Sequence, residues 1–292
     1  MQHRAPLALV AAAVAMFAVA LQLHLHALGL VQTAAGAATL VTCSALALNA
    51  SRVRPMPTRQ AVPAALAATV GNTLTPMGLG GSALSARMHA RTGLSGDEAL
   101  AAVTLRAVAS GVAGLLTAAV AAAWLGLPRP TLPGSGHTTA LVLVVLVVGG
   151  VAFGLACPLR RGRVAAHARG VVGAVAGVLK HPARTVVLIL GATGVICSQL
   201  LILDGAVRAV GGHIGIGPVL VTFVGSSAAR AAVPTPGGVG PVEAALVAGL
   251  SALGLPMATA AVAVAVYRTA GLWLPVGAGI FALRALRRQH LL

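Results

Sequence analysis

The chain has 292 residues, of which 58% are hydrophobic and only 8% are charged, and its mean hydropathy is +0.95. A soluble domain carries charges on about a quarter of its residues, so this composition excludes a soluble globular fold and predicts a protein solvated by lipid. The net charge of +16 does not indicate nucleic-acid binding, because the arginines flank apolar runs and only 2% of the residues are aromatic. Such basic ends are typical of cytoplasmic loops and anionic lipid surfaces.

The long apolar runs are rich in Ala, Leu and Val and do not alternate with a period of two, which predicts helices rather than a barrel. We expect an all-α polytopic bundle that forms one integral membrane domain over residues 1–292. About six full spans are long enough to cross a bilayer, and they lie at 7–28, 30–50, 95–125, 138–157, 183–203 and 256–283.

Two further stretches, 61–93 and 214–254, are apolar but broken by Pro and Gly, and each predicts a helical hairpin that either crosses fully or re-enters. The basic segments 51–60 and 159–182 and the C-terminus are expected in the cytoplasm. With that placement, the first hairpin enters from the cytoplasm and the second enters from outside.

The break in each hairpin carries nearly the same phrase. Residues 75–80 read TPMGLG and residues 235–240 read TPGGVG, and a Gly-Leu pair and then an arginine in an apolar run (Arg106, Arg268) follow each copy. Paired broken helices are typical of transporters built from inverted repeats. We therefore predict an inverted repeat with a first core at about 61–125 and a second at about 214–283.

Several polar residues outside the breaks have simpler interpretations. Ser95 and Glu98 have the spacing of a capping box that opens a long helix. Asp204 and Arg208, spaced i, i+4, predict a surface ion pair. The histidines, His89 among them, show no metal-ligand spacing and are expected at the membrane interface, so we predict no metal site and no cofactor.

The breaks are the expected substrate-binding region, because backbone groups freed by Pro and Gly persist in a membrane only when protein buries them or a wet cavity solvates them. A helix that restarts after a break points its positive N-terminus inward and suits a phosphate or carboxylate. The candidate binding residues are Arg230, Arg268, Glu243, Arg106, Thr235, Gly237, Gly238, Asn72 and Thr75.

Each of these candidates also has a structural interpretation. The breaks are kinks without a ligand in one interpretation, and the arginines snorkel or form internal ion pairs. Glu243 either complements a helix dipole or pairs with an arginine. Because charges inside apolar runs are costly, we predict that Arg230, Arg268 and Glu243 share one polar site, in which Glu243 neutralises one arginine and leaves charge for a ligand.

Two groups of residues resemble the signatures of the lysylphosphatidylglycerol synthase transmembrane-region, or flippase-like, family. The second signature matches Ala229-Arg230, the run 234–243, Tyr267-Arg268 and Trp273; the first matches 72–76, Gly80-Gly81 and 92–95 leading to Arg106. The resemblance covers nearly the whole chain and implies a polytopic protein that translocates phospholipid-type lipids. Many members carry an acid just after the first Gly pair, where this chain has Ser82, so the two repeats are not expected to carry the same charges.

The leading hypothesis is therefore a lipid flippase-like transporter of the bacterial plasma membrane, with anionic lipid headgroups as partners. The alternative is a non-transporting scaffold or accessory subunit of a cell-envelope glycosyltransferase or lipid-modifying enzyme, and a homo-oligomer or such an enzyme is a possible partner. An enzyme is disfavoured because no acid/base pair is evident. The family's bifunctional members add a cytosolic aminoacyltransferase domain; none is visible up to Leu292, so the chain is not expected to make aminoacylated lipids. A polar cavity inside the bundle would favour transport, whereas a dry, fully packed interior would favour the scaffold.

Overall fold

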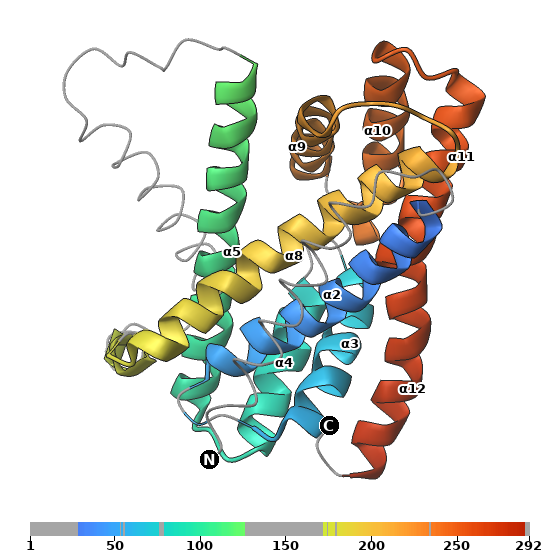
Figure 1. The fold of residues 1–292 in the computed structure, drawn as a ribbon. Coiled ribbons are helices and arrows are strands. Elements are labelled where there is room, and N and C mark those ends of the chain that lie inside the picture. Colours follow the sequence, from blue (N-terminus) through green and yellow to red (C-terminus); the bar gives the residue numbers. More distant parts are fainter. Residues whose placement is uncertain are drawn as a thin grey trace, which may run out of the picture.

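The computed structural model describes residues 29–52, 54, 56–75, 79–125, 172–173, 175–178, 180–233 and 235–289, and every long element among them is a helix (Figure 1). Among these described residues, four helical stretches are long and apolar enough to span a membrane, which confirms a membrane helical bundle. They are α2 (Gly29–Ala50), α5 (Gly96–Trp124), α8 (Pro182–Ala209) and the run Met257–Arg288. The predicted spans 7–28 and 138–157, and most of the basic segment 159–182, lie outside the described residues.

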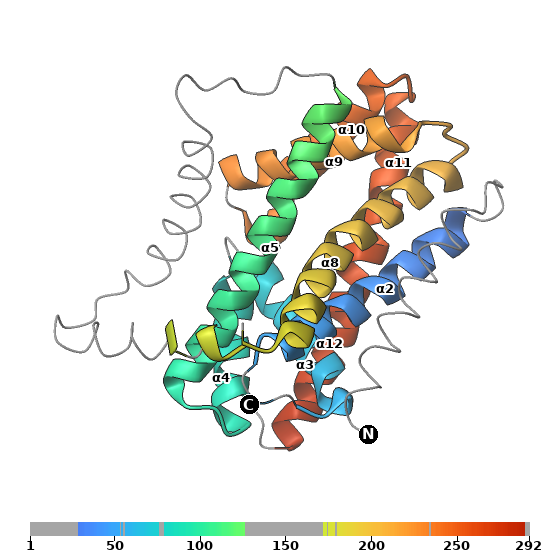
Figure 2. The ribbon, with the colours of Figure 1, turned by 60° about the vertical axis from the view of Figure 1, so that its left-hand side comes forward.

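Helices α2 and α8 pack side by side through glycines (Figure 2). A Cβ on Gly29 would lie 2.5 Å from the backbone nitrogen of Ala209, and one on Gly205 would lie 2.7 Å from Oγ1 of Thr33. Small residues allow membrane helices to approach closely, because packing rather than water exclusion holds them together. Their outer faces keep large apolar side chains exposed, among them Val186, Ile189 and Leu190, as a lipid-facing surface does.

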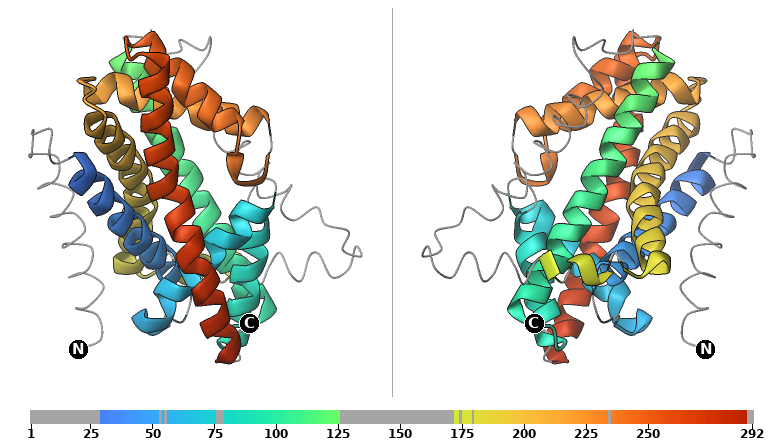
Figure 3. Two further views of the ribbon diagram at one scale, coloured as in Figure 1. Left: turned by 90° about the vertical axis from the view of Figure 1, so that its right-hand side faces the viewer. Right: turned by 90° about the vertical axis from the view of Figure 1, so that its left-hand side faces the viewer.

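The two broken hairpins are present. The first consists of α3 (Thr58–Leu74) and α4 (Leu79–Arg91), and the second of α9 (Ile216–Ala232), a 3-10 turn η3 (Pro236–Gly238) and α10 (Pro241–Ala252). None of these helices reaches the roughly 20 residues that a bilayer crossing needs, which favours re-entry over full crossing. The hairpins lie in opposite halves of the bundle (Figures 1 and 3).

The tips of the two hairpins meet inside the bundle. Helix α3 contacts the turn η3, and a Cβ on Gly237 would lie 3.1 Å from Cγ2 of Thr73. Two chain segments about 160 residues apart therefore bring their breaks together, which is the geometry that an inverted repeat produces. The repeat boundaries and the axis that relates them stay predictions.

The Gly-Leu pairs that follow the breaks end the second helix of each hairpin in the same way. Gly93 (φ 87°) and Gly254 (φ 97°) are left-handed, and the amides of Leu94 and Leu255 donate to the carbonyls five residues earlier, His89 and Leu250. This is the Schellman arrangement, in which glycine accepts a conformation that a Cβ would strain.

The predicted capping box at the start of α5 is confirmed. The Oγ of Ser95 accepts from the Glu98 amide at 3.2 Å, and Oε2 of Glu98 accepts from the Ser95 amide at 2.8 Å.

The last span is not a uniform helix. Helix α11 (Met257–Arg268) continues through a π-helical turn, η4 (Thr269–Trp273), into α12 (Leu274–Arg288). A π-turn leaves room for an extra residue and often accompanies a functional site. Here it begins directly after Arg268 and precedes the helix that packs on α3.

Two predictions about polar residues were wrong. Asp204 and Arg208 do pair, Nε to Oδ2 at 2.8 Å, but Asp204 is buried and also accepts from Nε2 of Gln32 at 2.7 Å, so the pair is not on the surface. The charge is tolerated because α2 supplies that second donor. His89 is fully buried and contacts Arg52, so it is not an interfacial residue.

Candidate functional site

A cavity of about 650 Å³ lies where the two hairpin tips meet. Its wall is formed by both hairpins together with parts of α2, α5, α8 and the η4–α12 region. The polar and charged side chains in the wall are those of Ser44, Thr69, Asn72, Thr73, Ser82, Ser85, His89, Arg106, Ser110, Gln199, Ser227, Arg230 and Thr235. A cavity of this size suits a small ligand or the headgroup of a lipid.

Two arginines line this cavity from segments that are far apart in the sequence. Arg106 comes from the middle of α5, and Arg230 comes from the last turn of α9. No Asp or Glu is among the described residues of the cavity wall, and neither guanidinium has a hydrogen bond or ion pair to the described part of the chain. An unpaired charge in an apolar span is costly unless it meets water or a ligand, so the cavity is a cationic site.

The second break is a tight turn that glycines make possible. Gly237, Gly238 and Gly240 all have positive φ, at 62°, 68° and 98°. A Cβ on Gly238 would also lie 2.8 Å from Cδ of Arg230, so this glycine makes room for the arginine stem. The hydroxyl of Thr235 donates to the Val239 carbonyl at 2.9 Å across the turn.

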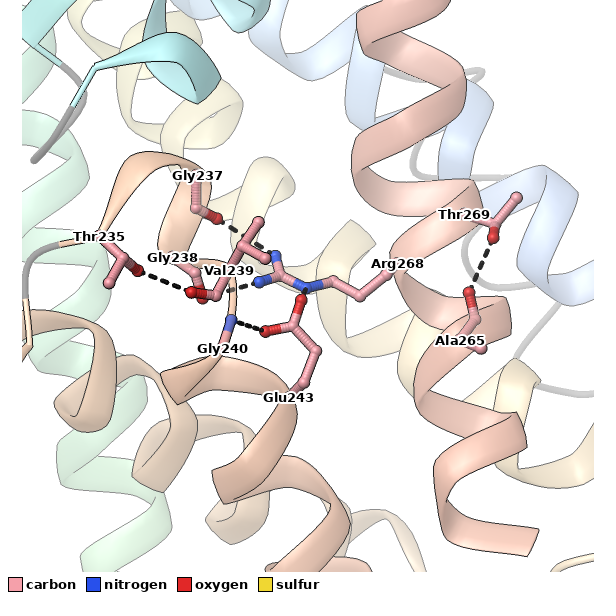
Figure 4. A network of polar contacts seen from close by, with 9 residues as sticks. All are labelled: Thr235, Gly237, Gly238, Val239, Gly240, Glu243, Ala265, Arg268 and Thr269. Atoms are coloured by element: carbon pink, nitrogen blue, oxygen red, sulfur yellow. Dashed lines mark hydrogen bonds and ion pairs between the residues drawn. The ribbon is translucent and has the colours of Figure 1, made fainter. Parts of the chain in front are cut away.

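Arg268 holds this turn from the last span (Figure 4). Its guanidinium donates to the carbonyls of Gly238 at 2.9 Å and Gly237 at 3.4 Å, and its Nε donates to Oε1 of Glu243 at 2.5 Å. The Arg268 side chain is 10% exposed. The planar guanidinium satisfies two carbonyls that the helix break would otherwise leave in an apolar environment.

Glu243 neutralises Arg268 and caps the restarted helix at the same time. One carboxylate oxygen accepts from Arg268, and the other accepts from the Gly240 amide at 2.7 Å. An acid in the first turn of a helix also complements its dipole. The predicted pairing of Glu243 with one arginine is therefore present, and Arg230 is the arginine that it leaves unpaired.

The first break has a different support. Oγ1 of Thr75 donates to the Gly71 carbonyl at 2.9 Å and accepts from the Gly80 amide at 2.7 Å, so one hydroxyl joins the end of α3 to the start of α4. A Cβ on Gly81 would clash with the side chain of Asn72. This glycine lets the asparagine lie against α4 at the edge of the cavity.

The candidate residues thus divide into two groups. Arg106, Arg230, Asn72, Thr235, Gly237 and Gly238 line the cavity. Arg268, Glu243 and Thr75 are not in its wall but hold the two breaks in place. Sequence reasoning did not single out Ser85, His89 and Gln199, which also line the cavity. The i, i+4 spacing of Ser85 and His89 on one face of α4 was a signal for the first two.

The fold and the site define a multi-pass helical membrane protein with a polar, positively charged cavity between two broken hairpins. Residues 3–279 match the sequence model of the family described as lysylphosphatidylglycerol synthase TM region. The chain belongs to this family, as the motifs at residues 72–106 and 229–273 predicted. No curated protein and no solved structure matches the chain.

Proposed function

We propose that the protein translocates a phospholipid-type lipid with an anionic headgroup across the bacterial plasma membrane. The observation that carries this proposal is the cavity with two arginines, Arg106 and Arg230, and no acid among its described wall residues. Guanidinium groups bind phosphate strongly, because their N–H donors match the geometry of phosphate oxygens.

The same observation favours transport over a scaffold. A scaffold or accessory subunit needs no internal polar cavity and would keep two unpaired arginines inside a membrane protein only at a cost. A flippase needs such a cavity, because a lipid headgroup must cross the apolar layer without losing all its polar contacts. Two breaks that meet within the bundle supply those contacts midway.

We also propose that the chain is not itself an aminoacyltransferase. Purified protein incubated with aminoacyl-tRNA and phosphatidylglycerol is expected to give no aminoacylated lipid, and formation of lysyl-lipid would refute this part of the proposal.

The orientation follows from the distribution of basic residues. Helix α3 begins and α12 ends at the same end of the bundle (Figure 3), and Arg59, Arg287 and Arg288 lie at those helix ends. Basic residues at span ends favour the cytoplasm, so we place the C-terminus there. A cysteine at Arg287 is expected to react only from the cytoplasmic side, and one at Gly215, the residue before α9, only from outside; the same sidedness for both would refute the topology.

Transport is tested with the purified chain in liposomes that contain phosphatidylglycerol carrying a fluorescent acyl chain. An impermeant reductant quenches only the outer leaflet, so translocation appears as additional loss of fluorescence. Arg106→Gln and Arg230→Gln are each expected to slow this loss by about tenfold or more, since each removes charged hydrogen bonds to phosphate.

The matched control is Arg287→Gln, which removes the same charge from an exposed position at the end of α12. This variant is expected to translocate lipid at the rate of the unaltered protein. The proposed function would be contradicted if the unaltered chain translocated lipid no faster than protein-free liposomes do. Equal translocation rates for the cavity variants and the control would also contradict it.

A further inference from the structure

Two polar atoms in the cavity wall have no hydrogen-bond partner in the described part of the chain. They are Oγ of Ser85 and Nε2 of His89; the two residues are 2% and 0% exposed. Both belong to α4, spaced i, i+4, and both line the cavity. Buried polar atoms are nearly always paired, so these two neighbouring atoms in a cavity wall are candidates to bond a ligand.

The protonation of His89 follows from its other nitrogen. Nη1 of Arg52 lies 3.2 Å from Nδ1 of His89. A guanidinium only donates hydrogen bonds, so Nδ1 accepts and the neutral ring carries its proton on Nε2. The atom without a partner is therefore an N–H donor.

Arg52 is itself fixed in place. It is 1% exposed, and its Nε donates to the Arg54 carbonyl at 3.0 Å in the bend after α2. Burial lowers the pKa of the Arg52 guanidinium to about 10, which leaves it protonated at neutral pH. Arg52 thus orients the His89 ring and does not compete for its free N–H.

The neighbouring helix α5 adds a positive charge to the same wall. Arg106 lines the cavity on the helix that packs against α4, together with Ala102 and Ser110 one turn before and after it. An N–H donor, a hydroxyl and a guanidinium without an acid among the described wall residues form a site for an oxyanion.

We propose that Ser85 and His89 of the first hairpin and Arg106 of the adjoining α5 form a phosphate-binding subsite, separate from Arg230 on the second hairpin. Its ligand is a phosphate group. The assignment of that phosphate to a lipid headgroup rests on the proposed function. The subsite lies in the half of the bundle that contains α4 and the end of α12 (Figure 1). A headgroup moving between the two leaflets would meet this subsite and Arg230 as two separate contacts.

The test uses the full chain in detergent and measures affinity for short-chain phosphatidylglycerol and for inorganic phosphate, with a short-chain diacylglycerol as the lipid without phosphate. Ser85→Ala is expected to weaken phosphatidylglycerol binding about threefold to tenfold. Its control is Ser251→Ala, because Oγ of Ser251 is the other buried hydroxyl without a partner among the described residues but Ser251 lies outside the cavity wall. That variant is expected to bind like the unaltered protein.

Two substitutions of His89 separate ligand binding from packing. The amide of Asn superposes on Nδ1, so His89→Asn keeps the acceptor for Arg52 and loses the free donor. The amide of Gln superposes on Nε2, so His89→Gln keeps a donor toward the cavity and loses the Arg52 contact. We expect about tenfold weaker binding for His89→Asn and a smaller loss for His89→Gln.

The outcomes separate this subsite from the proposed function. Unchanged phosphatidylglycerol affinity in Ser85→Ala and His89→Asn, with translocation intact in the unaltered chain, would overturn the subsite and leave the function standing. The expected losses without any translocation would support the subsite and refute the function. Losses seen equally with inorganic phosphate would support the subsite with free phosphate as its ligand, whereas equal binding of diacylglycerol would overturn it. If His89→Asn does not fold, the pair Ser85→Ala and Ser251→Ala decides.

Discussion

The two breaks carry nearly the same phrase but are supported in opposite ways. At the second break, Arg268 from the neighbouring span and Glu243 from α10 hold a turn of three glycines with positive φ. At the first, a single hydroxyl, that of Thr75, joins the two helices, and Arg106 points to the cavity without an acidic partner among the described residues. Arg268 thus holds a turn in place, whereas Arg106 lines the cavity, where we propose that it binds the ligand.

The difference traces to one missing carboxylate. The second repeat has Glu243 a few residues after its glycines, whereas the corresponding region of the first has Ser82, which lines the cavity. An acid there would neutralise Arg106 and leave less positive charge for a ligand. With Ser82 in that place, Arg106 has no acidic partner among the described wall residues, and its charge is one of the two on which the proposed function depends.

The largest effect on the free energy of unfolding is expected when Arg268 is removed, in contrast to the removal of Arg106. Arg268→Met removes the ion-pair partner of Glu243 and the donor to two backbone carbonyls, and should lower the free energy of unfolding by about 2–3 kcal/mol. This is somewhat less than for a fully buried pair because Glu243 is partly exposed. Arg106→Met removes an unpaired charge and should change stability by less than about 1 kcal/mol. Apparent melting temperatures in detergent compare the two, and equal losses would show that the arginines are equivalent.

Restoring the acid to the first repeat should remove the asymmetry in charge. Ser82→Glu places a carboxylate in the cavity wall, where it can pair with Arg106, and is expected to weaken phosphatidylglycerol binding about tenfold, or about 1.4 kcal/mol. Ser82→Gln has similar size without the charge and serves as control. If Ser82→Glu and Ser82→Gln bind lipid equally well, the carboxylate at position 82 does not neutralise Arg106.

Effects on stability smaller than that of Arg268→Met are expected at the threonines of the repeated phrase. Thr75→Val removes both bonds of a hydroxyl that is partly buried and leaves the Gly80 amide without its acceptor, so we expect a loss of about 1–2 kcal/mol. Thr235→Val removes a single hydrogen bond, which is exposed, and should cost about 0.5 kcal/mol or less. Thermal unfolding of both variants ranks them, and the reverse order would mean that the second break depends on its hydroxyl more than on Arg268.

Much of this fold could be predicted from the sequence because its main signals are local. Apolar runs gave the spans in the described residues, and the spacing of Ser95 and Glu98 gave the start of α5. The doubled phrase located both breaks. The Gly-Leu pair after each break looked like part of a motif, and its physical reason, a Schellman ending, became clear only from the backbone.

The site was harder to predict because its chemistry depends on partners that are distant in sequence. Asp204 is buried because Gln32 on another span donates to it. His89 is a cavity residue because Arg52, 37 positions earlier, holds its ring. The roles of Arg106 and Arg268 depend on which of them meets an acid and two free carbonyls. Spacing alone does not contain that information, although the serine at position 82 was a sign that the repeats differ.

The most direct test of the central claim is native mass spectrometry of lipids that remain bound to the purified protein. We predict that anionic phospholipid is enriched on the unaltered chain relative to the membrane, is lost from the double variant Arg106→Gln/Arg230→Gln and is retained by Arg287→Gln. Retention of the same lipid by the double variant, or a bound lipid without a phosphate, would contradict a cationic cavity that binds lipid headgroups.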